Sequence, residues 1–119
     1  MKQKNNWQQY KDIVNQNNIK CLYHFTDREN LASIISNGGL YSWADCEEKG
    51  IDIPKPGGSV SSRQLDSRDN LQNYVRVSFV TQHPMMYVAM NEGRISNPVI
   101  LKIDPEVIWL EGTKYSDRN

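Results

Sequence analysis

The chain has 119 residues, enough for one domain with a single hydrophobic core, and its 14 Lys and Arg balance 14 Asp and Glu to give zero net charge. Zero net charge argues against a polybasic protein that binds nucleic acid through a bulk positive field, although a local basic groove stays compatible with it. The sequence has no apolar run near the ~18 residues of a membrane-spanning helix and no signal peptide in its polar N-terminus, so we expect a cytoplasmic protein that does not bind membranes.

The beginning of the chain predicts a helix followed by a strand. In "WQQYKDIVNQN" apolar residues recur at helical spacing, which predicts an amphipathic helix carrying Trp7, Tyr10, Ile13 and Val14. The next run, "IKCLYHF" (residues 19–25), predicts a buried strand. Cys21 in this strand and the later Cys46 have no further Cys or His at metal-ligand spacing. We therefore expect two reduced thiols, with Cys21 in the core, and no metal site.

A second helix is predicted directly after this strand. Thr26, with Glu29 three positions later, has the pattern of a capping box and predicts a helix over residues 27–36. The apolar positions that we expect to face inward are Leu31, Ile34 and Ile35. Asn37 and Gly38 end this helix, because a glycine past a helix C-terminus takes a positive φ at little cost.

The middle of the chain predicts a short helix over residues 42–50 and then the longest irregular stretch, residues 51–70. Loops of this length in a compact domain are often functional. Residues 74–80, "YVRVSFV", alternate cleanly between apolar and polar. They predict a half-buried strand whose inner face carries Val75, Val77 and Phe79.

The last third predicts a helix over residues 83–93, with Pro84 at its first position and an apolar face of Met85, Val88 and Ala89. A strand over 98–104 follows, then a one-turn helix capped by Asp104, and "GTKYSDRN" begins another strand. Helices and strands are mixed, and neither G-x-G-x-x-G nor a P-loop is present. The order predicts an α+β domain built on a small sheet.

Three residues are candidates for a functional role, and each also has a purely structural interpretation. His24 ends a strand just before a helix start, so it is either a half-buried histidine bonded to the backbone or a neutral imidazole that bonds a ligand hydroxyl. Arg63 and Arg68 lie in the predicted loop and are either solvated or phosphate-binding, a task that suits the planar guanidinium. No nucleophile constellation stands out, so single residues leave the function open.

The order of motifs along the chain is more specific than any one of them. The segments "LYHFTDRENLASIISNGGLYS", "SSRQLD", "LQNYVRVSFVTQHPMMYVA", "PVILKIDPEVIW" and "KYSDRN" occur in the order that resembles the DarT-type ADP-ribosyltransferase family, over about residues 19–119. The resemblance implies an α+β ADP-ribosyltransferase fold, with two small facing antiparallel sheets and flanking helices around an NAD cleft. It also implies transfer of ADP-ribose from NAD to bases of single-stranded DNA, as a toxin paired with a macrodomain antitoxin.

The resemblance carries over to residues that would line the NAD cleft at strand ends, helix starts and turns. These positions are His24, Thr26, Asn30, Gly39, Leu40, Arg63, Tyr74 and Ser78. Among them Arg63 matches the arginine that acts on the NAD diphosphate or at the reacting centre, so we expect it to be catalytic. NAD is expected as the ADP-ribose donor, with no metal.

One departure from the family pattern concerns the catalytic glutamate. The resemblance places it on a strand after the "DRN" segment, where this sequence stops, and Glu92, Glu106 and Glu111 occupy other positions. We therefore expect residues 1–119 to be one ADP-ribosyltransferase-like domain that is truncated at its C-terminal end. The alternatives are a catalytically incomplete module that binds NAD or nucleic acid, and a transferase that acts on protein or RNA.

Overall fold

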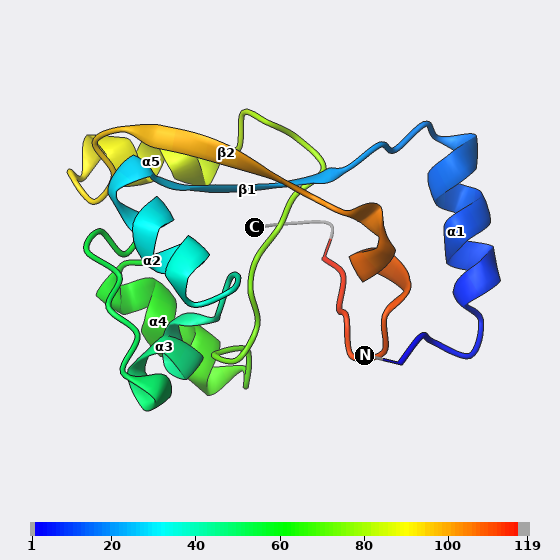
Figure 1. Ribbon diagram of the computed structural model, residues 1–119, viewed down its shortest axis with the longest axis horizontal. Helices are drawn as coiled ribbons and strands as arrows, with labels where there is room; N and C mark the ends of the chain where they lie inside the picture. Colours follow the sequence, from blue (N-terminus) through cyan, green and yellow to red (C-terminus); the bar gives the residue numbers. More distant parts are fainter. Residues whose placement is uncertain (1, 117–119) are drawn as a thin grey trace.

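The computed structural model describes residues 2–116 and has an α+β architecture. In chain order the elements are α1 (Trp7–Gln16), β1 (Leu22–Asp27), η1 (Arg28–Asn30), α2 (Leu31–Ser36), α3 (Trp43–Lys49), α4 (Val60–Arg68), α5 (Pro84–Asn91), β2 (Pro98–Ile103) and η2 (Pro105–Trp109). Figure 1 shows the β1–β2 ribbon running along the molecule, with α1 and η2 at one end and α2, α3 and α4 grouped below the other. Among the described residues there is one two-stranded sheet, so the second facing sheet stays a prediction.

The sheet pairs β1 antiparallel with β2 and aligns His24 with Leu101. On the other edge of β1, Tyr23 forms an isolated bridge with Ser78, in which both N–H···O bonds are 2.8 Å. The strand predicted over residues 74–80 is therefore wrong, because within it only Ser78 pairs with a neighbour. Its expected inner face is also wrong, since Phe79 is 58% exposed. Alternation alone does not make a strand when the chain turns away after a single bridge.

The hydrophobic core lies where α1 meets η2 and the start of β1. Its buried members are Val14, Leu22, Ile108 and Trp109. The predicted amphipathic helix is confirmed here for Trp7, Tyr10 and Val14, whereas Ile13 is 53% exposed. The one-turn helix after Asp104 is also confirmed, and the Asp104 carboxylate accepts a hydrogen bond from Glu106 N at 2.9 Å. Cys21, expected in the core, is half-buried instead, whereas Cys46 is buried, and both thiols are free.

The junction between β1 and the following helix differs from its prediction in detail. Asp27, not Thr26, is the capping residue: its Oδ1 accepts from Glu29 N at 2.9 Å, while Thr26 belongs to the strand. The predicted helix is split into η1 and the short α2. None of the six residues of α2 is fully buried: Leu31 and Ile34 are half-buried, and Ile35 is 77% exposed rather than inward.

Two further helices correct the predictions for the second half. The stretch expected to be irregular contains α4, whose N-terminus is capped by the Ser59 hydroxyl accepting from Ser62 N at 3.1 Å. In α5 the first-turn proline and the buried Ala89 are confirmed, but Met86 is buried in place of Met85 and Val88, which are 38% and 39% exposed. The last predicted strand is absent from residues 112–116, and residues 117–119 lie outside the described part of the chain.

Candidate functional site

His24 is held by one ring nitrogen. Its Nδ1 lies 2.7 Å from the backbone oxygen of Arg76. Because a carbonyl can only accept, Nδ1 carries the hydrogen, and the neutral ring presents the lone pair of Nε2. Nε2 has no hydrogen-bond partner within residues 2–116. Burial lowers the pKa of His24 below its ordinary value, and the bond to Arg76 only partly opposes this, so the ring stays neutral at pH 7.

Asn30 joins the end of β1 to the loop before α4. Its amide nitrogen donates to Thr26 Oγ1 at 3.0 Å and to the carbonyl oxygen of Lys55 at 2.8 Å, while its Oδ1 accepts from Lys55 N at 2.9 Å. The side chain is 2% exposed. Both amide hydrogens are therefore used within the protein, and a direct contact with NAD would have to use the second lone pair of Oδ1.

Asp27 fixes the segment before β2 against the same strand end. Its Oδ2 accepts from the backbone N–H groups of Ser96 at 2.7 Å and Asn97 at 3.1 Å. The pKa of this carboxyl is lowered, first by the Glu29 N–H that it caps and further by the Ser96 and Asn97 N–H groups. Arg94 in this segment also donates to the Gly57 carbonyl, so the loops before α4 and before β2 are bonded together.

Arg63 projects from α4 onto the face of Trp43 in α3. Its guanidinium carbon lies 5.2 Å from the centre of the Trp43 ring, and Nη1 is 3.5 Å from a carboxylate oxygen of Glu47. Nε is buried without a partner in the described part of the chain. The two side chains border a hollow of about 420 Å³ that Val60, Gln64 and Ser67 complete. A planar cation held in this way has unused donors for an anionic group such as a diphosphate.

Arg68, the other candidate arginine, behaves differently. It is 70% exposed at the end of α4 and pairs with the adjacent Asp69 at 3.2 Å. This contact favours the solvated interpretation over phosphate binding.

The four remaining predicted site residues contact nearby groups or lie in a turn. The Lys114 ammonium nitrogen lies 5.0 Å from the centre of the Tyr74 ring, and Ser78 Oγ donates a hydrogen bond to the Val80 carbonyl at 2.9 Å. Gly39 has φ of 153°, a conformation that suits glycine, in the turn after α2. Leu40 follows it and is half-buried.

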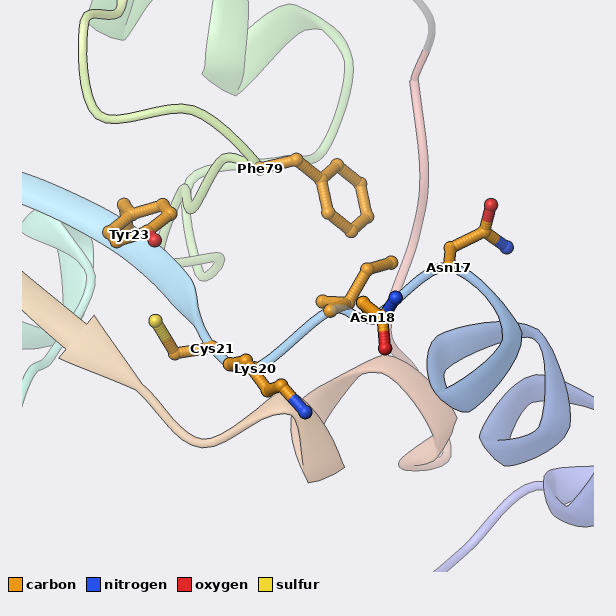
Figure 2. Close-up of a pocket in the computed structure, with 7 residues that line it drawn as sticks. Asn17, Asn18, Lys20, Cys21, Tyr23 and Phe79 are labelled. Atoms are coloured by element: carbon orange, nitrogen blue, oxygen red, sulfur yellow. The ribbon is translucent and has the colours of Figure 1, made fainter.

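A second hollow lies at the start of β1, on the side of the Tyr23–Ser78 bridge. Its volume is about 460 Å³, and it is lined by Asn17, Asn18, Ile19, Lys20, Cys21, Tyr23 and Phe79. Figure 2 shows Tyr23 and Phe79 approaching it from β1 and from the segment after the bridge. Aromatic rings, carboxamides and one ammonium group suit a flat polar ligand such as a nucleobase.

Sequence reasoning missed Trp43, Glu47 and the lining of the second hollow, because neither cluster has a local motif. Within residues 2–116 no group of His, Cys, Asp and Glu could hold a metal ion.

Comparison with known proteins gives one family. A family model described as "ssDNA thymidine ADP-ribosyltransferase, DarT" matches residues 23–119, a span that includes every predicted site residue. No curated protein and no solved structure matches the chain.

Proposed function

This chain belongs to the DarT family of ssDNA thymidine ADP-ribosyltransferases, and from that membership we propose that it transfers ADP-ribose from NAD to thymidine in single-stranded DNA. In this reaction the bond between the nicotinamide nitrogen and ribose C1′ breaks, and nicotinamide leaves with the bonding electrons. A bond forms between C1′ and a nucleophilic atom of the thymine base, which gives up a proton. The family match over residues 23–119 carries the proposal.

His24 and Arg63 are proposed to hold the two ends of the reacting part of NAD. The neutral His24 ring offers Nε2 as an acceptor for a ribose hydroxyl, because Nδ1 is already bonded to Arg76. Arg63 offers guanidinium donors to the diphosphate, and its place in the lining of the hollow beside Trp43 supports a ligand there. Holding the ribose and the diphosphate orients C1′ for attack, which is the main contribution that positioning makes to such a transfer.

Single-stranded DNA fits this proposal because a base in a duplex must first leave its stack, at a cost of a few kcal/mol. The hollow in Figure 2 supports contact with an unpaired strand, since Phe79 and Tyr23 offer surfaces on which a base can stack. The ammonium group of Lys20, which also lines this hollow, can pair with a phosphate of the strand.

Two expectations about cellular context stay predictions, namely a toxin role with a macrodomain antitoxin and a cytoplasmic location. On membranes the structure adds one finding: none of the described helices is long and apolar enough to cross a bilayer.

The test is the intact mass of two oligonucleotides after incubation with NAD and this protein. One is a strand of deoxycytidine with a single thymidine, and the other has deoxycytidine in its place. In protein that carries the glutamate expected after the "DRN" segment, we expect a gain of one ADP-ribosyl group on the thymidine strand alone, a smaller yield when a complementary strand is annealed, and loss of the gain in Arg63→Ala. Arg68→Ala, on the same helix but exposed, should keep it.

Transfer to neither strand, by this chain or by a chain extended to include the expected glutamate strand, would contradict the proposal. NAD binding without any transfer would favour the incomplete binding module, and transfer to RNA or protein instead would favour the third alternative.

A further inference from the structure

Asp66 is a buried carboxylate that the proposed function does not use. It lies on α4, is 7% exposed, and has two partners from different parts of the chain. Its Oδ2 accepts from the indole Nε1 of Trp43 at 3.2 Å, and its Oδ1 pairs with the guanidinium of Arg76. Burying a charge is costly unless it is paired and hydrogen-bonded, so these two contacts explain how Asp66 is tolerated there.

The first contact leads to Arg63. Asp66 and Arg63 are three positions apart on α4 and therefore lie on the same side of the helix. Trp43 is held by both: its N–H donates to Asp66, and its ring face carries the Arg63 guanidinium at 5.2 Å. The carboxylate thus fixes the rotation of the indole, and the indole fixes the plane on which the arginine lies.

The second contact leads to His24. The Arg76 side chain is bound to Asp66, while the Arg76 carbonyl accepts from His24 Nδ1 at 2.7 Å. Beyond this residue the segment is joined to β1 by the bridge between Ser78 and Tyr23. The ion pair therefore anchors to α4 the backbone oxygen that sets the tautomer of His24.

We propose that Asp66 is a positioning residue that holds Arg63, through Trp43, and His24, through Arg76, in one fixed arrangement before NAD arrives. Its importance for catalysis rests on the proposed function, whereas the arrangement itself is a property of the free protein. Side chains held in this way lose less freedom when the ligand binds, which raises affinity and keeps the reacting atoms in line.

The two contacts can be separated by substitution. Trp43→Phe keeps an aromatic ring under Arg63 but removes the N–H that Asp66 accepts. Arg76→Gln keeps the backbone oxygen but removes the ion pair. Asp66→Asn weakens both contacts. Asp69→Asn is the matched control, since Asp69 follows the same helix, is exposed, and pairs only with Arg68 among the described residues.

Two measurements read the two contacts independently. In ligand-free protein, ¹H–¹⁵N correlation spectra of the imidazole rings report the tautomer of His24. Its signals are readily assigned because the chain has only two histidines. Calorimetry with NAD reports the affinity. Arg76→Gln should lose the single Nδ1–H tautomer, Trp43→Phe should keep it, and Asp66→Asn should lose it. All three should bind NAD about three- to tenfold more weakly, the range for one hydrogen bond.

If Asp66 had only a general structural role, the three variants would not differ in the tautomer of His24 in this way. A fixed Nδ1–H tautomer in both Asp66→Asn and Arg76→Gln, or unchanged NAD affinity in Asp66→Asn and Trp43→Phe, would overturn the proposal. Protein that shows the expected tautomer pattern and NAD affinities but transfers nothing to DNA would support the arrangement and contradict only the transfer activity.

Discussion

At the scale of single residues, the hydrogen bond of His24 fits the structural interpretation of its sequence position and leaves one ring nitrogen for the ligand contact, which stays a prediction. Nδ1 is bonded to the backbone of Arg76, as expected of a half-buried histidine at a strand end. That same bond leaves Nε2 as a neutral acceptor, as expected of a histidine that binds a ligand hydroxyl. The two roles use different nitrogens and do not compete.

We expect His24→Ala and Arg63→Ala each to weaken NAD binding without unfolding the protein. Loss of one neutral hydrogen bond from His24 should cost about 1 kcal/mol, or roughly fivefold in the dissociation constant. Loss of charged donors from Arg63 should cost about 1.5–3 kcal/mol. Titration calorimetry measures both values, and circular dichroism confirms the fold. Arg68→Ala is the control, and unchanged affinity in both test variants would refute the assignment.

The pH dependence of NAD binding follows from the same ring. Burial lowers the pKa of His24 below its ordinary 6.5, so the folded protein keeps a neutral Nε2 at pH values where a free histidine is already half protonated. Affinity should therefore stay constant from about pH 8 to 6.5 and fall only at lower pH. As the pH falls, the unfolded chain takes up this proton before the folded protein does, so the free energy of unfolding also decreases in acid. In His24→Ala the fall in affinity at low pH should be absent.

At the scale of elements, local patterns predicted the parts of the fold that local forces decide. The helix at Trp7–Gln16, the strands around His24 and Leu101, and the turn after Asp104 all appear in the structure. The helix over Val60–Arg68 was not predicted, because it buries Asp66 and leaves Val60 and Leu65 exposed, so it has no apolar stripe. In the structure it is capped by Ser59 and bonded to α3 through Asp66 and Trp43.

The candidate site shows the same division. His24 was identified from its place at a strand end, and Arg63 gained its expected role from the family resemblance. Trp43 and Asp66 could not be predicted, since the bond between them joins residues 23 positions apart that share no motif. Asn30 was predicted to contact NAD, and the structure adds a separate task for it in holding Lys55.

That task gives a prediction for the loop before α4. Asn30→Ala removes the partners of the Lys55 N–H and carbonyl, which should lower the free energy of unfolding by about 1–3 kcal/mol. Urea unfolding measures this loss, and limited proteolysis should detect faster cleavage within residues 51–58. Asn73→Ala removes an exposed amide outside this loop and should change neither measurement. Equal stability of the two variants would show that the loop is held by other contacts.

At the scale of the whole molecule, the main apolar cluster and the polar contacts between α3 and α4 lie at different ends. The buried apolar cluster of Val14, Leu22, Ile108 and Trp109 lies where α1 meets η2. Near the other end of the ribbon in Figure 1, α3 and α4 are joined by the Trp43–Asp66 bond and by the contact of Arg63 with Trp43. The proposed NAD contacts therefore involve the end with the smaller apolar core.

Local stability should follow this division and should change when NAD binds. Segments with few buried apolar contacts open more readily than the core, and the one buried residue of α4 is Asp66. Amide hydrogen exchange should therefore be fastest in α3 and α4 and slowest in β1, β2 and η2. NAD should slow exchange in α4, because Arg63 gains a partner there, and should leave α1 unchanged. Arg63→Ala should abolish this slowing while keeping the slow exchange of β1. Exchange in α4 as slow as in β1 without NAD would mean that the polar contacts alone make this end as stable as the core.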